Sequence, residues 1–480
     1  MKHHSNKDHL LAMIRQGQPM TMRQQAHLVL SLSMPAILAQ LTTTIMQYID
    51  ASMVGSMGAE ASASIGLVET TTWLMGSLCS ATATGFYVQV SHQLGANRGA
   101  KARNILRQGI VSVLVVSLCI GLIALAISPM LPKWLGGNDA INHSASIYLA
   151  TISLALPAFQ FSMFGSGMLR SSGNMVVPSV MSVVMMGLNV VFNFFLIFPT
   201  RMVTIWGVGF VVPGAGLSVA GAALGTVGAE LIAALITMYI LCFRSKELNL
   251  RQDSGRFKPT RSVIKRAFHI SVPMGLQQAA MTSAYIVTTI IIAPLGTIAI
   301  AANSFGIIVE SLCYMPGYGI ADAATTLAGQ SLGAGRHELT KRFAWLSVGL
   351  GMGVMTLMGI VMYMGAPFAL SMMTPVDEIR QLGTTILRIE AFAEPMFAAA
   401  IVSYSVFVGI ARTVAPCVIN LASMWGVRIV LATILAPTMG LRGVWLAMCI
   451  ELCFRGMVFL IKLASTRWQP NKSQQQQTIA

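Results

Sequence analysis

Charged residues are scarce in this chain, and acidic residues are the scarcest. Asp and Glu together make up 16 of the 480 residues, and all charged side chains only 10%. A soluble globular protein carries about 25% charged residues, so this composition excludes an ordinary soluble fold. The hydrophobic content of 55% and the mean hydropathy of +0.70 place the chain in a lipid bilayer instead.

Cysteine and histidine offer no reactive or metal-binding arrangement. The seven cysteines are scattered along apolar stretches without the paired spacing of zinc or redox sites, and we interpret them as small core residues. His92 and His269 lie near the ends of apolar segments, and His3, His4 and His9 lie in a polar start that we expect to be disordered. Since no nucleophile with a base and no metal cluster falls within the apolar segments, the sequence predicts neither an enzyme nor a bound cofactor.

Long apolar runs are abundant. A membrane-spanning helix needs ~20 predominantly apolar residues, and the first 27 residues contain no such stretch, so we expect the first span to insert as an anchor rather than as a cleaved signal. We predict twelve spans, at residues 28–55, 64–92, 105–130, 145–168, 175–198, 215–242, 267–293, 297–328, 343–366, 384–408, 416–437 and 440–463.

The 31 Lys and Arg residues are distributed unevenly among the breaks between these spans. They gather before the first span and in alternate breaks, most densely from Arg244 to Arg266, while only Lys133, Arg201, Arg380 and Arg442 fall in the other breaks. The positive-inside rule therefore predicts that both termini are cytoplasmic. The net charge of +15 then orients the protein and contacts anionic membrane lipid, and we expect no nucleic-acid binding.

The chain repeats itself at a spacing of 238 residues. This shift superimposes Ser33 and Pro35 on Ser271 and Pro273. It also aligns Gly58 with Gly296, Leu94-Gly95-Ala96 with Leu332-Gly333-Ala334, Pro157 with Pro395, Pro178 with Pro416 and, after an insertion from Pro199 to Gly214, Gly221 with Gly443. Because each half holds an even number of spans, both halves enter the membrane from the same side and are parallel repeats.

We therefore predict an all-α integral membrane protein of twelve transmembrane helices. They form two parallel six-helix lobes, related by a pseudo-two-fold axis along the membrane normal. The predicted segments are a cytoplasmic N-terminal segment (1–27), a first lobe (28–243), a basic cytoplasmic inter-lobe loop (244–266), a second lobe (267–463) and a polar cytoplasmic tail (464–480), disordered from Ser473 to Thr478. Such repeats enclose a substrate cavity near the bilayer midplane and alternate its access, which favours a transporter over a channel or an enzyme.

A set of motifs follows the predicted spans in a fixed order. They are the Pro35 helix running to Asp50 and Gly58, Leu94-Gly95-Ala96, Met168-Leu169-Arg170 with Gly173 and Pro178, the pair Asn189 and Asn193, Gly221 to Thr226, and Gly329 to Gly335. In order and spacing, over residues 28 to 463, this set resembles the multidrug and toxic compound extrusion (MATE) family, bacterial type. The resemblance implies a V-shaped pair of helical bundles in the plasma (inner) membrane, a monomer, that exports cationic, amphipathic drugs or toxic metabolites in exchange for H⁺ or Na⁺.

Three acidic residues lie in the spans of the first half: Asp50, Glu69 and Glu230. The only Lys or Arg inside those spans is Arg107, at the start of the third one. A carboxylate inside the membrane is costly unless it is paired or hydrated, so each is a functional candidate. Glu69 lies near the outer end of its span, where water would solvate it. Asp50 is deeper and its repeat counterpart is Thr288, so that charge belongs to one half. An Asp50 that only accepts hydrogen bonds from neighbouring helices is the alternative.

Acidic residues in the spans of the second half have arginines beside them. The acids are Glu310, Asp322, Glu390, Glu394 and Glu451, and the arginines are Arg388, Arg428 and Arg455. Glu451 precedes Arg455 by four positions, the favourable order for an intrahelical ion pair. We therefore expect salt bridges here, and the possible coupling roles of Glu310 and Asp322 stay open.

Helical spacing assembles the candidate coupling site in the first half. Thr43, Gln47 and Asp50 share one face of their span, as do Asn189 with Asn193 and Thr226 with Glu230. We predict that these seven residues bind the coupling ion, with helix packing as the alternative for the Asn pair. One carboxylate with amide and hydroxyl oxygens suits Na⁺, and a desolvated Asp50 suits a proton, so both ions stay open and no other metal is expected.

The resemblance also exposes departures from the family. Related members carry a second aspartate at the position of Asn193, so the site here has one charge fewer. Some bacterial members carry acids in the second half at positions that fall on Met281 and Phe397, which weakens a sodium site there.

The 33 methionines suit an adaptable substrate cavity. Our candidates for its walls are Met46, Tyr48, Phe159, Met163, Phe397 and Tyr404. The alternative function in transport is a flippase for a lipid-linked precursor, which would use Arg388, Arg428 and Arg455 to receive pyrophosphate. A channel or a membrane-embedded enzyme has less support.

Overall fold

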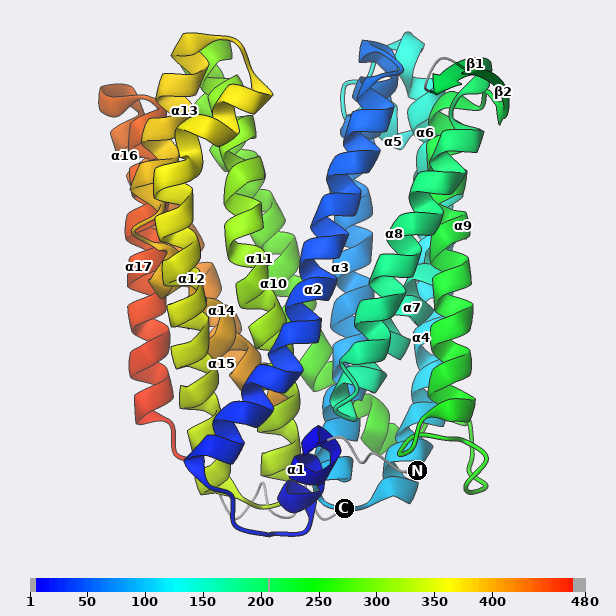
Figure 1. The fold of residues 1–480 in the computed structure, drawn as a ribbon, viewed down its shortest axis with the longest axis vertical. Coiled ribbons are helices and arrows are strands. Elements are labelled where there is room, and N and C mark those ends of the chain that lie inside the picture. Colours follow the sequence, from blue (N-terminus) through cyan, green and yellow to red (C-terminus); the bar gives the residue numbers. More distant parts are fainter. Residues whose placement is uncertain (1–5, 206–207, 469–480) are drawn as a thin grey trace. The chain divides into compact units, whose positions relative to one another are not determined.

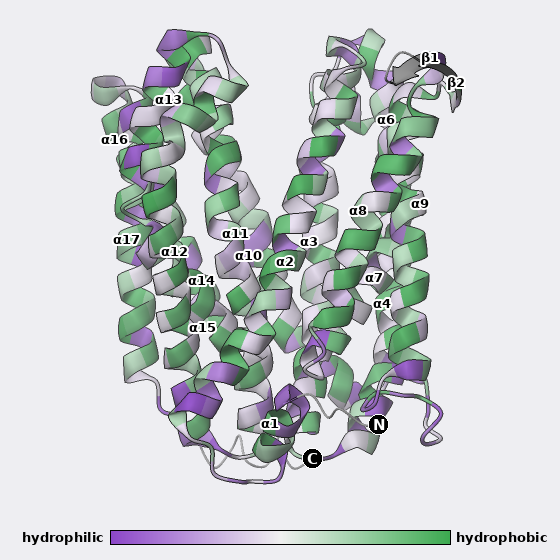
Figure 2. Cartoon of the chain, in the orientation of Figure 1, coloured by the Kyte–Doolittle hydropathy of each residue, from purple (hydrophilic) through white to green (hydrophobic). Residues whose placement is uncertain are grey.

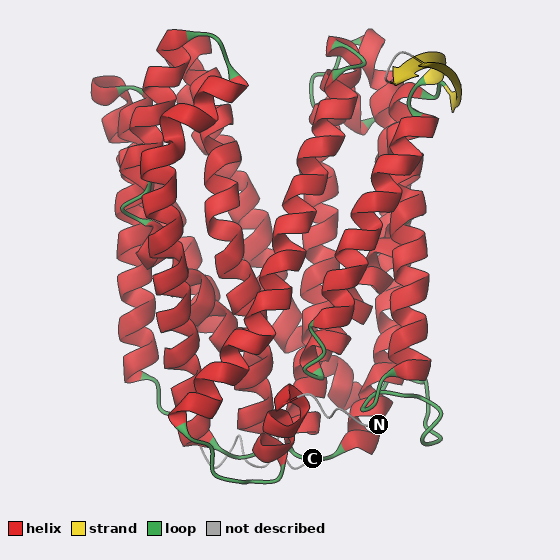
Figure 3. Ribbon diagram, in the orientation of Figure 1, coloured by secondary structure: helices red, strands yellow, loops and turns green. Residues whose placement is uncertain are grey.

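The computed structural model describes residues 6–205 and 208–468, and its regular structure is helical apart from one small hairpin (Figure 3). The disorder predicted for residues 473–478, and for His3 and His4, falls outside the described residues.

The long helices account for the predicted spans (Figure 1). They are α2 (Met22–Gly55), α3 (Ala59–Gly95), α4 (Gly99–Ile127), α6 (Asp139–Leu154), α7 (Leu156–Ser171), α8 (Val176–Leu196), α9 (Ser218–Tyr239), α10 (Arg261–Ile292), α11 (Thr297–Gly333), α12 (His337–Met373), α13 (Asp377–Glu390), α14 (Glu394–Gly409), α15 (Val414–Ser423), α16 (Val430–Met439) and α17 (Leu441–Ser465). Short elements join them: α5 (Leu131–Trp134), the 3₁₀ helix η2 (Ala293–Leu295), and the π-helical turns η1 (Ile240–Arg244) and η3 (Met424–Ile429).

Within the described residues, nine helical segments are long and apolar enough to cross a membrane, and two bent pairs add two more. Hydrophobic residues dominate these helices, as Figure 2 shows. Helix α3 is as long as α11, but its many Ser and Thr residues make it less apolar. With α3 included, the described part of the chain holds the twelve spans that the sequence predicts.

Two of the spans are broken, and the cause is the same in both. Helices α6 and α7 meet at a bend of 48°, and α13 and α14 at a bend of 56°. Pro157 and Pro395 are the second residues of α7 and α14, a position where the missing N–H of proline costs no helical hydrogen bond. The repeat of Pro157 as Pro395 therefore marks a break that both halves share.

The structure contains two elements that the sequence did not predict. The insertion after Pro199 forms an antiparallel hairpin of β1 (Pro199–Ile205) and β2 (Val208–Ala215), in which Pro199 pairs with Ala215. Residues Asn6–Arg15 form helix α1, which buries Leu10, Leu11, Met13 and Ile14. The expectation that the residues around His9 are disordered is therefore wrong. They belong to α1, whose apolar face packs against the protein.

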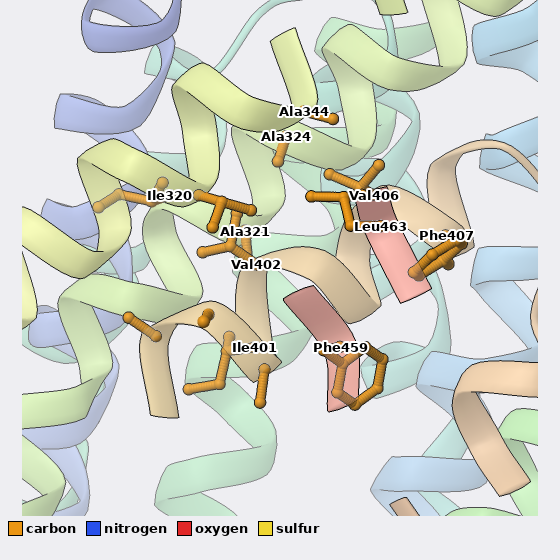
Figure 4. Close-up of a cluster of buried hydrophobic side chains, with 14 of the residues drawn as sticks. Ile320, Ala321, Ala324, Ala344, Ile401, Val402, Val406, Phe407, Phe459 and Leu463 are labelled. Carbon is orange, nitrogen blue, oxygen red and sulfur yellow. The ribbon is translucent and has the colours of Figure 1, made fainter. Parts of the chain in front are cut away.

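The chain divides into two compact units. Unit 1 contains Met1–Gln40, Ser91–Arg98 and Leu276–Ala480, and unit 2 contains Leu41–Val90 and Gly99–Gly275. Each has a core of its own. In unit 1, α11, α14 and α17 bury a cluster that includes Val402, Phe407 and Phe459 (Figure 4). In unit 2, α3, α4 and α6 bury a cluster around Val68, Ala124 and Leu149. Close packing of such side chains holds helices together in lipid.

Two arginines of α4 fasten the linker, residues 245–260, within unit 2. Arg107 is 3% exposed, and its Nη2 donates to the carbonyl oxygen of Leu250 (2.9 Å) and to Asp253 Oδ1 (2.8 Å). Arg103 Nε donates to Asp253 Oδ2 (2.8 Å). Burial raises the pKa of Asp253, but the hydrogen bonds and charges of Arg107 and Arg103 outweigh it and hold that pKa below its ordinary value.

We expect this clamp to order the linker in a pH-dependent way. A carboxyl with a lowered pKa stabilises the folded state above its unfolded pKa, of about 4, and this contribution is lost as the pH falls through the folded value. Asp253→Asn should therefore speed amide hydrogen exchange in residues 245–260 several-fold at pH 7. The difference from wild type should shrink below about pH 4. Glu60→Gln, which neutralises an exposed carboxylate, is the control and should change nothing. A difference that persists at low pH would argue against the clamp.

Candidate functional site

Four polar side chains form one hydrogen-bonded chain across three helices of unit 2. Asn193 Nδ2 on α8 donates to Asp50 Oδ1 on α2 (2.8 Å) and to Asn189 Oδ1 (3.1 Å). Asn189 Nδ2 then donates to Thr226 Oγ1 on α9 (3.2 Å), and this hydroxyl donates to the carbonyl oxygen of Ala222 (3.0 Å). Asn189 and Asn193 are buried, while Asp50 is half-buried. The structure therefore brings together Asp50, Asn189, Asn193 and Thr226.

A glycine on α9 makes room for this chain. A Cβ atom at Gly225 would lie 2.0 Å from Asn193 Oδ1, and one at Gly221 would lie 2.4 Å from the carbonyl oxygen of Leu196. The two glycines are four residues apart, the spacing that lets membrane helices approach closely. From the sequence alone, Gly221 is a repeat and family position, and Gly225 has no predicted role. The four-residue spacing of the two glycines is the sequence signal that could have identified the role of Gly225.

Gly225→Ala should disturb the site. The added methyl group must displace Asn193 or separate α8 from α9, and such overpacking costs about 1–3 kcal/mol. We expect a lower unfolding temperature and export reduced at least several-fold. Gly187→Ala on α8 is the matched control, since a Cβ at Gly187 meets no atom within 4 Å. Alanine is also the better helix former there. Equal behaviour of the two variants in a thermal unfolding and efflux assay would contradict this role of Gly225.

The two ends of the Asn193 amide have different surroundings. Its nitrogen faces the Asp50 carboxylate, while its oxygen lies against Gly225 and has no hydrogen-bond partner in the described structure. An N–H donor stabilises the ionised carboxylate and occupies a position that a cation ligand would need. The same Asn193 nitrogen also donates to Asn189 Oδ1. No group of three or more His, Cys, Asp or Glu that could hold a metal ion occurs among residues 6–205 and 208–468.

The other predicted site residues lie apart from the hydrogen bond between Asn193 and Asp50. Gln47 is exposed, and Thr43 is half-buried about two turns before Asp50. Glu230 is 7% exposed on α9 and hydrogen-bonds with Ser162 of α7. Glu69 is exposed on α3.

The repeat has no equivalent of this site in the second half. The 238-residue shift places Thr288, Val427 and Leu431 at the positions of Asp50, Asn189 and Asn193. Beyond the hairpin insertion, Ala447 takes the position of Gly225. Alanine fits there, since Leu431 carries no amide that needs room. The polar chain is therefore a feature of one half.

The salt-bridge prediction for the second half is correct for Glu451. This carboxylate is fully buried, with Arg428 Nη2 at 2.9 Å from Oε2 and Arg455 Nε at 3.1 Å from Oε1. Ser423 Oγ also donates to Oε1 (2.6 Å). Asp322 accepts a hydrogen bond from Gln40 Nε2 (3.1 Å).

The prediction is wrong for Glu310, Glu390 and Glu394, which form no ion pair within the described residues. The reason is that Arg428 and Arg455 both turn to Glu451. Both carboxylate oxygens of Glu394 are buried without a hydrogen-bond partner in the part of the chain that the structure describes.

The candidate cavity residues have mixed environments. In unit 2, Met46 is buried, Tyr48 and Phe159 are half-buried, and Met163 is 38% exposed. In unit 1, Phe397 packs edge-on against Tyr314 with ring centres 5.4 Å apart. Tyr404 Oη lies 4.0 Å from Cys417 Sγ.

Twelve membrane-spanning helices, an internal repeat and a buried polar chain around one carboxylate define an integral membrane transporter. The chain belongs to the MatE family, whose sequence profile matches residues 35–195 and 273–434. The two matched segments begin 238 residues apart (35 and 273), the spacing of the repeat. The family resemblance stated from the motifs is therefore confirmed.

Curated relatives match over nearly the whole chain. The probable multidrug resistance protein NorM of Thermotoga maritima is 24% identical over 92% of both chains. The multidrug resistance protein MdtK of Yersinia pestis is 22% identical over 93% of this chain and 96% of its own.

Solved MATE structures share the fold. The structure of MATE in the straight conformation matches with a TM-score of 0.83 at 19% identity, over 95% of this chain and 98% of that one. The Vibrio cholerae MATE transporter VcmN matches with a TM-score of 0.82 at 18% identity, over 92% of this chain and 97% of that one. The fold is therefore that of MATE transporters.

Proposed function

We propose that this protein is a secondary active multidrug efflux transporter. It exports cationic and amphipathic organic compounds by alternating access, in antiport with H⁺ or Na⁺. The names of the NorM and MdtK relatives support the substrate class. The observation that carries the coupling proposal is the hydrogen-bonded chain from Asp50 through Asn193 and Asn189 to Thr226.

Binding of the coupling ion at Asp50 changes the hydrogen bonds that these polar side chains can form. An ionised Asp50 accepts the hydrogen bond of Asn193, whereas a protonated carboxyl is a weaker acceptor and carries a donor of its own. Protonation therefore weakens the hydrogen bond between α2 and α8. Through Asn189 and Thr226 it also weakens the contact of α8 with α9. A coupling ion that shifts the packing of these helices lowers the affinity for the drug and favours its release outward.

Of the two ions, the geometry favours the proton. The Asn193 nitrogen, not its oxygen, faces the carboxylate, and Na⁺ requires oxygen ligands. For Na⁺ to bind, the Asn193 amide would have to turn and give up its hydrogen bonds to Asp50 and Asn189.

The test is export by purified protein in lipid vesicles under separately imposed gradients. A fluorescent organic cation reports export while either a pH gradient or a sodium gradient is applied alone. We expect the pH gradient to drive export. Export driven only by sodium would replace the proton by Na⁺, and export that neither gradient accelerates would overturn antiport.

The arginines disfavour the alternative of a lipid-precursor flippase. Arg428 and Arg455 are committed to Glu451, and the Arg388 guanidinium lies over the ring of Tyr363 at 5.1 Å. Arg428 and Arg455 are therefore not free to receive a pyrophosphate. We further propose a monomer in the plasma (inner) membrane. The distribution of Lys and Arg supports cytoplasmic positions for both termini.

A further inference from the structure

A basic cavity of about 880 Å³ lies in unit 1 at the start of α12, and we call it the α12 cavity. Four Lys or Arg side chains and one Glu line it: Arg336, Lys341, Arg342, Arg467 and Glu338. The excess of positive charge indicates an anionic occupant.

The start of α12 adds backbone donors to this cavity. Arg336 is the N-cap residue and makes no side-chain capping bond, so the first amide groups of a 37-residue helix lack a side-chain acceptor. A helix N-terminus with free N–H groups attracts a phosphate or carboxylate.

Buried polar atoms of the lining also lack partners. Gln25 is 1% exposed, and its Oε1 accepts no hydrogen bond from any described residue. The His337 Nδ1 and Trp468 Nε1 atoms are likewise buried and unpartnered within the described ranges. A ring nitrogen that donates would suit a phosphate oxygen, and the Gln25 oxygen would suit a hydroxyl or ammonium group beside the phosphate.

The equivalent position in the internal repeat shows which group a basic site of this kind binds when the protein itself supplies the anion. The 238-residue shift places Arg103 of α4 at the position of Lys341. In unit 2, Arg103 holds the carboxylate of Asp253, which the linker brings in after η1. The segment in the corresponding place after α17, residues 466–480, contains no Asp or Glu. This segment therefore offers the α12 cavity no acidic side chain.

A second, smaller cavity of about 370 Å³ identifies the source of that anion. It shares Glu338, Lys341 and Arg342 with the α12 cavity and continues onto Met22, Trp345 and Leu346. Met22 and Trp345 are exposed apolar side chains at the starts of membrane-spanning helices. A charged cavity that runs into an apolar groove fits a headgroup with its acyl chain, whereas free phosphate would leave the groove empty.

We propose that the α12 cavity binds the phosphate headgroup of an anionic phospholipid of the cytoplasmic leaflet, with an acyl chain lying along Trp345. Lys341, Arg342 and the N-terminus of α12 bind the phosphate, and Trp468 Nε1 donates a further hydrogen bond to it. The lipid fixes the loop between α11 and α12 in unit 1.

The experiment measures the thermal stability of the full-length protein in detergent with added phosphatidylglycerol, phosphatidylcholine or inorganic phosphate. Wild type should be stabilised by phosphatidylglycerol and unaffected by phosphatidylcholine. The double variant Lys341→Gln, Arg342→Gln should lose at least half of that shift. The charge-matched control Arg261→Gln, Lys265→Gln changes two exposed residues of unit 2 and should keep it.

Three results would overturn the proposal. Equal responses of both double variants would show that the effect is not local to the α12 cavity. A shift with inorganic phosphate as large as that with phosphatidylglycerol would assign the site to a free anion. A chain ending at Trp468 that responds to phosphatidylglycerol when the full chain does not would show that the C-terminal segment occupies the cavity. Native mass spectrometry of retained phosphatidylglycerol provides the same comparison without heating.

Discussion

Asp50→Asn should abolish ion-driven export and leave the protein folded. The amide has the size of the carboxyl and keeps an oxygen that can accept the hydrogen bond of Asn193, so the chain to Asn189 and Thr226 can form. It cannot exchange a proton or bring a negative charge to a cation, so the site loses the property that couples it to a gradient. We expect a loss of at least tenfold in export driven by a gradient, with an unfolding temperature close to that of wild type.

The readout that separates coupling from folding is drug binding. The Asp50→Asn protein should still bind an organic cation, with an affinity that no longer changes with pH. Glu69→Gln is the matched control, because it neutralises an exposed carboxylate of the same half and should retain both driven export and the pH dependence. Driven export at the wild-type rate by Asp50→Asn would remove Asp50 from the coupling site.

The candidate coupling site was only partly predictable from the sequence. Spacing of four residues correctly joined Asn189 to Asn193, since residues at i and i+4 meet on one helix face. The related spacing of three residues grouped Gln47 with Asp50, yet Gln47 is exposed. In an apolar helix with few polar residues, spacing shows which side chains share a face but not which helix that face meets.

The fold followed more directly from the sequence than the polar contacts did. Long apolar runs and the paired Pro157 and Pro395 predicted the spans and the repeat, because bilayer thickness and the missing proline N–H act locally. The pairing of Glu394 could not be predicted this way. We expected a salt bridge for Glu394 because arginines lie in the same half of the sequence. The direction of each guanidinium, however, depends on the tertiary packing.

Glu451→Gln should strongly destabilise unit 1. Arg428 is 6% exposed and Arg455 is 5% exposed, and both depend on this carboxylate. Removing one partner from a buried ion pair costs about 3–5 kcal/mol, because the remaining charge stays buried without compensation. Glutamine preserves the volume of the side chain, so the loss reports charge rather than packing. We expect a lower unfolding temperature and poor yield of folded protein.

Glu394→Gln provides the contrast, because the same chemical change is made at another buried glutamate 1% exposed. An ionised carboxylate without a partner raises the free energy of the folded state, so its neutralisation should leave stability unchanged or increase it. Thermal unfolding of the two variants in one detergent and at one pH gives the comparison. If Glu394→Gln were the more destabilised variant, Glu394 would have an ion partner that the described contacts lack. If neither variant lost stability, the Arg428, Glu451 and Arg455 cluster would be structurally dispensable, and both arginines would be available for other ligands.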